Sequence, residues 1–256
     1  MKPFLLLATR AEDAAADNEY ESFLAFSGLA ERELRRLRLE RRALGEIDPD
    51  DWSGILLGGG PFNASDPPEA KSAVQHRVER DLEGLLARVL AADFPFLGAC
   101  YGVGTVGARI GATLDHRYAE PVGPTWITLT EAGRADPLFE VLPERFEAFV
   151  GHKEAISVLP PEAVLLAGSA ACPVQAFRVG RHVYATQFHP ELDLAGLFTR
   201  IDVYKHAGYF PPEQADELKA LAGHSHVVHP PAVLRRFVAR YGARTSSDRP
   251  VDASLA

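Results

Sequence analysis

The stretch FLGACYGVG, residues 96–104, decides the fold class of this chain. An apolar, strand-like run leads into Cys100, which Gly98 and Gly102 flank, and a helix-like sequence follows. This pattern is typical of a nucleophile elbow, a strained strand-to-helix turn that lifts one side chain above the edge of a sheet. The flanking glycines let the backbone pass closely, because a β-carbon at either position would clash. We therefore expect a nucleophilic Cys100 rather than a small core residue, which is the usual place of a free cysteine.

The predicted helix after Cys100 has two consequences for the chemistry at the thiol. A helix N-terminus favours an anion beside it, and the thiolate is the nucleophilic form of cysteine. The backbone N–H of Tyr101 comes directly after the nucleophile, where a donor to an oxyanion normally points. The sequence therefore predicts an increased thiolate fraction at Cys100 and an oxyanion donor at Tyr101.

Strands and helices alternate outward from this turn. Continuous apolar runs at residues 4–8 and 52–57 predict strands that are buried on both faces. Apolar residues at intervals of three and four predict a long helix that Asp66 caps. Strand-like runs dominate residues 113–187, and helical segments follow them. We therefore expect a three-layer α/β fold of the flavodoxin-like kind, with helices on both faces of a mostly parallel central sheet.

Composition and charge exclude several classes of protein. The 256 residues contain no linker, so we expect one domain over residues 1–242 and a polar, disordered tail over residues 243–256. The net charge of −8 argues against binding to nucleic acid. No apolar run reaches the ~20 residues that cross a bilayer, and two cysteines cannot form a disulfide framework. We therefore expect a cytoplasmic protein that binds neither membrane nor nucleic acid.

The second chemical element is QFHPE, residues 187–191. In an extended backbone alternate side chains share a face, so His189 and Glu191 point the same way. Pro190 restricts His189 to extended conformations, which lets the Glu191 carboxylate accept a hydrogen bond from one imidazole nitrogen. The pair then forms the base and orienter of a nucleophilic triad. The alternative is a solvated His-Pro turn at a strand end.

The third element is ILLGGGP, residues 55–61, where a predicted strand ends in three glycines. Such a run lets the backbone turn sharply and expose its N–H groups. A plain tight turn and a phosphate-binding loop are the alternatives. The pattern GxxxxGK[ST] of a phosphate-binding loop is absent, so the phosphate interpretation is weak.

Together, these motifs resemble class I glutamine amidotransferases, which use a Cys-His-Glu triad, and most of all the amidotransferase domain of GMP synthetase and its stand-alone relatives. ILLGGGP, GACYG and QFHPE occur in the family's order over residues 55–191. The resemblance implies that Cys100 attacks the side-chain amide of glutamine and forms a thioester. It also implies that His189 protonates the departing ammonia and then activates water, while Glu191 orients His189.

The resemblance also implies an oxyanion hole and substrate contacts. The second oxyanion donor is a backbone N–H of Gly59 or Gly60. The family usually has glutamine four residues after the nucleophile, at the α-amino-acid end of the substrate, and this chain has Gly104 there. Gly151 and His152 match the segment that holds the substrate's α-carboxylate. Alternatively, His152 merely starts a helix or a loop.

We therefore expect a hydrolase that cleaves a γ-glutamyl amide and releases ammonia, or an amine, and glutamate. Because 256 residues leave no room for a nucleotide-activating domain, we expect either a glutaminase subunit that serves a synthetase partner or a self-contained γ-glutamyl peptide hydrolase. The pattern also leaves open a catalytically silent regulatory module and an esterase or peptidase of the same fold. No metal or other cofactor is expected, because the candidate ligands His224, His226 and His229 lack a Cys or carboxylate at a standard spacing.

Overall fold

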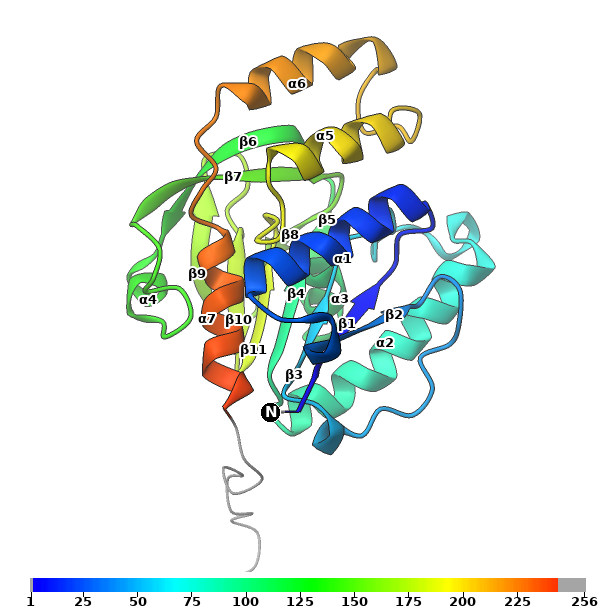
Figure 1. Ribbon diagram of the computed structural model, residues 1–256, viewed down its shortest axis with the longest axis vertical. Helices are drawn as coiled ribbons and strands as arrows, with labels where there is room; N and C mark the ends of the chain where they lie inside the picture. Colours follow the sequence, from blue (N-terminus) through cyan, green and yellow to red (C-terminus); the bar gives the residue numbers. More distant parts are fainter. Residues whose placement is uncertain (1, 244–256) are drawn as a thin grey trace, which may run out of the picture.

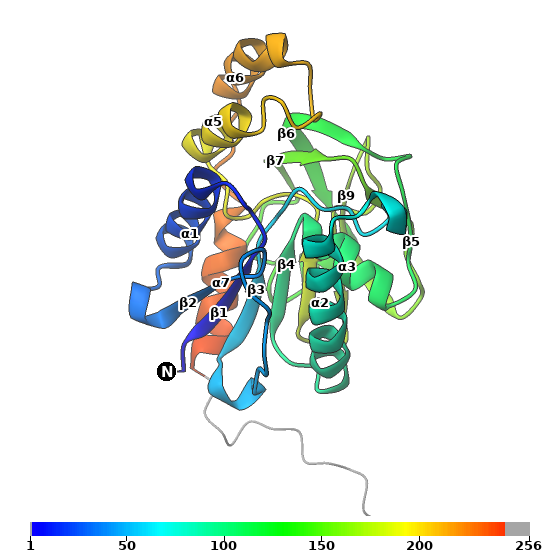
Figure 2. The same ribbon diagram turned by 90° about the vertical axis from the view of Figure 1, so that its right-hand side faces the viewer.

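The computed structural model describes residues 2–243 and arranges them in three layers around one large sheet (Figures 1 and 2). Nine strands form this sheet in the order β2-β1-β3-β4-β11-β10-β9-β6-β7. Their bounds are Phe4–Ala8 (β1), Leu34–Arg38 (β2), Gly54–Leu57 (β3), Phe96–Ala99 (β4), Glu120–Leu129 (β6), Arg145–His152 (β7), Ala163–Ser169 (β9), Ala176–Val179 (β10) and Val183–Thr186 (β11). Of the predicted tail over residues 243–256, all but Ala243 lies outside the described residues.

The strand directions confirm the predicted α/β class. Strands β2, β1, β3, β4 and β11 pair in parallel, and the remaining neighbours pair antiparallel. Seven of the nine strands therefore run in one direction, and β10 and β6 run against them. The sheet is mixed and mostly parallel, as expected.

Helices cover both faces of the sheet because its central strands are apolar on both sides. Phe4 and Leu6 of β1 face the helices α1 (Asp13–Ser27) and α7 (Pro231–Gly242). The alternate residues Leu5 and Leu7 face the opposite layer, which contains α2 (Ala73–Ala91) and α3 (Tyr101–Arg109). The shorter elements are α4 (Glu131–Ala135), α5 (Leu194–Val203), α6 (Ala215–Gly223) and the two-stranded sheet of β5 (Thr113–Asp115) and β8 (Ala155–Val158).

The start of α2 differs from the expectation that Asp66 caps this helix. Pro68 holds the residue before it, Pro67, in an extended conformation with ψ 143°, which a helix cannot continue through. A short 3-10 turn follows, and the helix begins at Ala73. Ser72 caps it, because its hydroxyl accepts a hydrogen bond from the N–H of Gln75 at 3.1 Å.

Three neighbouring strands carry the three motifs to one edge of the sheet. The glycine turn follows β3, Cys100 follows β4, and His189 follows β11, and these strands lie side by side in parallel. The carboxyl ends of parallel strands are the usual place for a site in such a sheet. Helices α5 and α6 lie beyond this edge, at the top of Figure 1.

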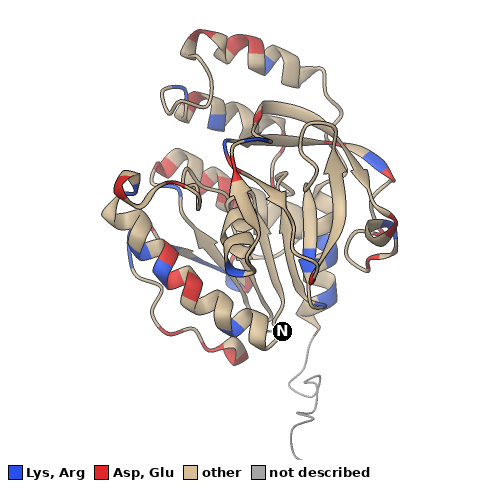
Figure 3. Ribbon diagram, turned by 180° about the vertical axis from the view of Figure 1, so that it is seen from behind, with Lys and Arg blue, Asp and Glu red and all other residues tan. Residues whose placement is uncertain are grey.

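The outer surface bears charges of both signs. Lys and Arg alternate with Asp and Glu along α2, which lies at the lower left of Figure 3. Within residues 2–243, no helix is both long enough and apolar enough to cross a membrane.

Candidate active site

Cys100 occupies the strand-to-helix turn between β4 and α3. Its backbone has φ 52° and ψ −87°, a conformation that L-residues rarely adopt. The N–H of Cys100 donates a hydrogen bond to the carbonyl of Thr186 in β11 at 2.7 Å. A β-carbon at Gly98 would lie 2.8 Å from the α-carbon of Gly102, so the close passage requires glycine at residue 98. The expected clash at Gly102 is wrong, because a β-carbon there would meet only Leu57, at 3.9 Å. The geometry is that of the predicted elbow.

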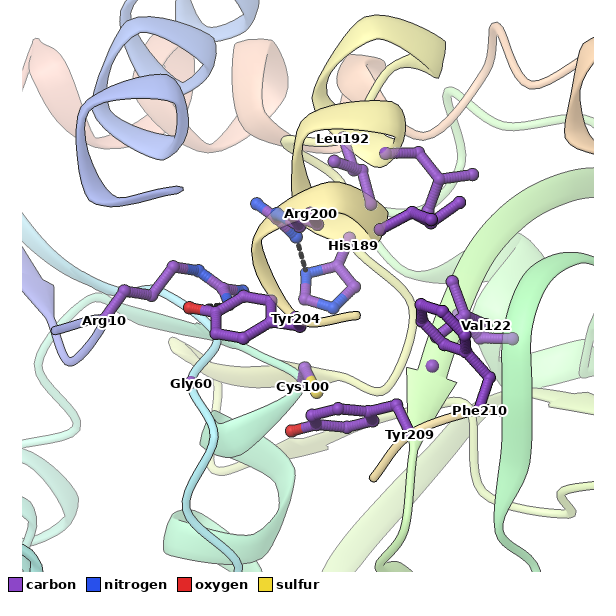
Figure 4. A pocket seen from close by; sticks show the side chains of 14 residues that line it. Arg10, Gly60, Cys100, Val122, His189, Leu192, Arg200, Tyr204, Tyr209 and Phe210 are labelled. Atoms are coloured by element: carbon purple, nitrogen blue, oxygen red, sulfur yellow. Dashed lines mark hydrogen bonds between the residues drawn. The ribbon is translucent and has the colours of Figure 1, made fainter. Parts of the chain in front are cut away.

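His189 and Glu191 lie beyond the end of β11, and His189 faces the same cavity as Cys100 (Figure 4). The Nδ1 of His189 lies 2.7 Å from Oε1 of Glu191, and both residues are buried. Arg200 donates to the same carboxylate oxygen at 2.9 Å. Within residues 2–243 no hydrogen bond involves the Nε2 of His189, so this nitrogen is free for a proton.

The cavity beside Cys100 is small and mostly apolar. Its volume is about 50 Å³, which is room for one or two water molecules at about 30 Å³ each. Tyr209 and Phe210 cover it from the segment after α5. The remaining lining residues are Arg10, Gly60, Val122, Val150, Gly151, Leu192, Leu197, Arg200, Ile201 and Tyr204.

Burial keeps both reacting groups neutral at rest. Burial raises the pKa of the Cys100 thiol to about 12, although Arg10 and Arg200 act against this rise. Burial also lowers the pKa of His189 to about 4, despite the opposing effect of Glu191. The expected increase in thiolate is therefore wrong for the resting protein, because the loss of solvent around the sulfur outweighs the positive charges near it.

The glycine turn fits tightly against the site. A β-carbon at Gly59 would lie 2.7 Å from Cε1 of His189, and one at Gly60 would overlap the hydroxyl of Thr9. That hydroxyl donates a hydrogen bond to the carbonyl of Gly59 at 3.2 Å, which fixes the turn. Gly60 lines the cavity, and Tyr101 is the first residue of α3 after Cys100. Of the three predicted oxyanion residues, Gly60 therefore lines the cavity, Gly59 lies against His189, and Tyr101 directly follows Cys100.

Gly104 faces a side chain that the sequence motifs did not indicate. A β-carbon at this position would overlap Oε1 of Glu154, which is buried against α3. The two oxygens of Glu154 accept hydrogen bonds from the backbone N–H of Ala64 at 3.1 Å and of Ser65 at 2.5 Å. Glu154 therefore fills the space at residue 104 and holds the loop that follows the glycine turn. In the sequence, only its position two residues after His152 could have indicated that Glu154 lies near the site.

The structure separates Gly151 from His152. Gly151 lines the cavity, whereas the His152 ring is buried elsewhere and ends β7 rather than starting a helix or a loop. Its Nε2 lies 2.9 Å from Oε2 of Glu120, and its Nδ1 donates to the carbonyl of Glu154 at 2.9 Å. The imidazole of His152 is therefore not directed at the cavity.

Glu120, His152 and Cys172 are the one group among residues 2–243 with spacing suited to a metal ion, since their ligand atoms lie within 4.8 Å of one another. Glu120 already accepts hydrogen bonds from Thr125, Ser169 and Gln175 besides its contact with His152. Because both nitrogens of His152 are also engaged, these residues form a closed polar cluster whose imidazole and carboxylate are already hydrogen-bonded.

Three further charged residues lie behind His189 and belong to none of the sequence motifs. Arg10 follows β1, Glu19 lies on α1, and Arg200 lies on α5. Arg10 and Arg200 line the cavity, and Glu19 contacts both of them. No regular spacing links these residues, so only the fold brings them together.

Comparison with known proteins agrees with this geometry. The family model described as "Glutamine amidotransferase class-I" matches residues 28–196, about two thirds of the chain. Glutamine-hydrolysing GMP synthase of Thermomicrobium roseum is 31% identical over 150 residues, which are 56% of this chain and 25% of that protein. One subunit of glutamine-hydrolysing GMP synthase from Thermoplasma acidophilum is 28% identical over 167 residues, which are 63% of this chain and 76% of that protein.

A solved structure extends the likeness to nearly the whole chain. The crystal structure of a glutamine amidotransferase from Thermotoga maritima has a TM-score of 0.71 at 18% identity. The match covers 95% of this chain and 100% of the other. At this identity the likeness shows the fold. The chain spans only about a quarter of the length of the Thermomicrobium protein.

Proposed function

Because this chain belongs to the class I glutamine amidotransferase family, we propose that it hydrolyses the γ-amide of glutamine and releases ammonia and glutamate. One observation carries the proposal. Cys100, at a turn with φ 52°, faces the same cavity as His189, whose Nδ1 is hydrogen-bonded to Glu191. This arrangement supports a thiol nucleophile with a base and an orienter.

The first step forms a thioester. The Sγ of Cys100 attacks the amide carbon while Nε2 of His189 takes the thiol proton, since Nδ1 is directed at Glu191. The carbonyl oxygen becomes an oxyanion, which the backbone N–H of Tyr101 and that of Gly59 or Gly60 stabilise by about 3–4 kcal/mol each. The C–N bond then breaks, and His189 gives its proton to the nitrogen, which leaves as ammonia.

The second step releases glutamate. Water attacks the thioester carbon while His189 takes one of its protons, and the C–S bond breaks as the proton returns to the sulfur. Both reacting groups are neutral at rest, so the proton moves from Cys100 to His189 only as the sulfur attacks. Glu191 stabilises the imidazolium that forms in each step.

The surroundings of Gly104 favour a second candidate substrate. The family's glutamine at this position contacts the α-amino-acid end of the substrate, and here Glu154 occupies the space. A γ-glutamyl peptide or γ-glutamyl amine differs from glutamine in its leaving amine. Recognition at the α-end then depends on other groups, such as the backbone of Gly151. A self-contained γ-glutamyl hydrolase is therefore the alternative.

We also propose that the partner that receives the ammonia is a synthetase subunit. This proposal rests on the relatives whose names describe one subunit of a glutamine-hydrolysing GMP synthase. A glutaminase that depends on its partner hydrolyses glutamine slowly when purified alone, whereas a self-contained hydrolase reaches full turnover.

The test measures ammonia and glutamate release from glutamine and from a panel of γ-glutamyl peptides and amines, with Cys172→Ala as the matched control for Cys100→Ala. We expect equimolar ammonia and glutamate from glutamine. Faster release of amine from the panel would favour the γ-glutamyl hydrolase. No turnover of any compound would contradict the proposal and favour a silent module.

A further inference from the structure

A chain of four buried charges of alternating sign ends at the imidazole of His189. The Nε of Arg10 donates to Oε1 of Glu19 at 2.9 Å. The Nη2 of Arg200 lies 3.6 Å from that same oxygen and donates to Oε1 of Glu191 at 2.9 Å. The two arginines are 5% and 7% exposed, and both glutamates are fully buried. The set therefore holds two guanidinium and two carboxyl groups with almost no contact with solvent. Burial raises the pKa of Glu19, and Arg10 and Arg200 act against this rise.

The fold brings these residues together from distant segments. Helices α1 and α5, which carry Glu19 and Arg200, pack against each other (Figure 1). The glycine turn leaves the space that the charges need. A β-carbon at Gly58 would lie 2.5 Å from Oε2 of Glu19, and one at Gly59 would lie 2.8 Å from Nη2 of Arg10. The glycines thus accommodate the charged chain as well as the turn.

Stability alone does not explain a buried set of charges. A buried ion pair recovers in attraction about what its desolvation costs, and apolar residues of similar size often serve as well. These charges also lie beside the base rather than elsewhere in the core. Arg200 contacts both members of the pair, because its Nη1 lies 3.0 Å from Nδ1 of His189 (Figure 4).

We propose that Arg200 is a positioning residue for His189 and Glu191, and that Glu19, held by Arg10, balances its charge. Arg200 binds the carboxylate oxygen that also accepts the hydrogen bond from His189. It therefore fixes the Glu191 side chain and, through it, the imidazole. Its positive charge also opposes a second proton on His189, which keeps the ring neutral and able to accept the proton of Cys100.

The proposal predicts the direction in which each neighbouring charge shifts the pKa of His189. Glu191, Arg200, Arg10, Glu19, Cys100, Tyr204 and Tyr209 are the titratable or charged groups that face the ring from the elements around it. Burial lowers the pKa of His189 to about 4, Glu191 raises it, and Arg200 and Arg10 lower it. Loss of the charge on Arg200 raises this pKa, and loss of the charge on Glu19 lowers it.

The experiment follows the imidazole of His189 by NMR between pH 8 and pH 4.5, with the signal assigned by its loss in His189→Gln. We expect the ring to stay mostly neutral over this range in the wild type. In Arg200→Met we expect the midpoint to rise by about one pH unit or more, into the measured range. Glu19→Gln shifts it downward or leaves the ring neutral throughout. Arg200→Lys keeps the charge and gives a midpoint between those of the wild type and Arg200→Met.

A change in stability alone would not bring the midpoint into the measured range in Arg200→Met while leaving the ring neutral in Glu19→Gln. An unchanged midpoint in folded Arg200→Met would overturn the proposal. If that variant does not fold, Arg200→Lys and Glu19→Gln decide, and a rise in Glu19→Gln would overturn it. The proposal rests on the proposed function for the role of His189 as the base. The NMR titration needs no substrate. A failure of this proposal can therefore be distinguished from a failure of the proposed glutamine hydrolysis.

Discussion

Two sets of the same three residue types invite comparison. The elbow set is Cys100, His189 and Glu191, and the closed set is Cys172, His152 and Glu120. The two sets share their main contact, since the imidazole and carboxylate lie 2.7 Å apart in the first and 2.9 Å apart in the second. Burial raises the pKa of each thiol to about 12. Residue types, the His-Glu contact and thiol acidity therefore do not distinguish the sets.

Access and unused hydrogen-bonding capacity do distinguish them. The thiol of Cys100 faces a cavity at a strained turn, whereas the thiol of Cys172 is directed at the carbonyl of Val174, 3.6 Å away. The Nε2 of His189 has no hydrogen bond within residues 2–243, whereas both nitrogens of His152 are engaged. A site for chemistry needs a base with a free nitrogen and a nucleophile that faces a cavity, and of these two sets only the elbow set has both.

The largest expected contrast is between the two cysteines. Cys100→Ala should lower kcat/KM by at least about 10⁴-fold, because it removes the nucleophile from a set of residues that act as a unit. Cys172→Ala should change kcat/KM by less than about twofold, because Cys172 does not face the cavity. Ammonia release measures both. Normal turnover by Cys100→Ala would remove the basis of the comparison.

The two histidines sharpen the contrast by separating activity from stability. His189→Gln should lower kcat by about 10²–10⁴-fold through the loss of the general base. His152→Gln should leave kcat within a few-fold but lower the free energy of unfolding by about 1–3 kcal/mol, since it breaks buried hydrogen bonds. Steady-state kinetics and urea unfolding of both variants provide the check. Equal losses of kcat would place both histidines in the chemistry.

Glu154 contacts residues near both sets, so variants at this contact test whether the two sets are independent. Its carbonyl accepts from His152, and its carboxylate fills the space at Gly104 beside the elbow. Gly104→Ala should lower the free energy of unfolding by about 1–3 kcal/mol, because the new β-carbon displaces that carboxylate. Gly104→Gln should be at least as destabilising, so it should not improve glutamine binding by itself.

The matched control for this clash is the double variant Gly104→Ala with Glu154→Ala. Once the Glu154 side chain is removed, Gly104→Ala should cause almost no further loss in the free energy of unfolding. Urea unfolding of the two single variants and the double variant closes this cycle. Additive losses would show that Glu154 does not determine what residue 104 can be.

The smallest expected effect is the response of kcat/KM to pH near neutrality. His189 must be neutral to act as a base, so activity falls only as pH drops through the His189 pKa of about 4. Cys100 stays a thiol until its pKa of about 12 and loses its proton to His189 during attack. We therefore expect kcat/KM to vary by less than about twofold between pH 6 and pH 8. A steep rise with pH across this range would indicate a preformed thiolate with an ordinary pKa.

Local spacing explains which parts of the molecule could be predicted. The elbow at Cys100 and the His189–Glu191 pair depend on residues that are close in sequence, so their geometry follows from backbone rules. The alternating apolar runs likewise predicted the mostly parallel sheet. By contrast, the contacts of Arg200 with Glu19 and of Glu154 with Gly104 join elements with no fixed spacing. The start of α2 was missed because Pro68 overrides the capping pattern at Asp66.

The most direct test of the account is covalent labelling with a diazo-ketone analogue of glutamine at pH 7, followed by peptide mapping by mass spectrometry. Burial raises the pKa of both thiols to about 12, so we expect selective labelling to come from the site around the sulfur rather than from a difference in thiol acidity. The account predicts one adduct, on Cys100, with labelling strongly slowed in His189→Gln and unchanged in His152→Gln. Equal labelling of Cys100 and Cys172, or no adduct on Cys100, would contradict it.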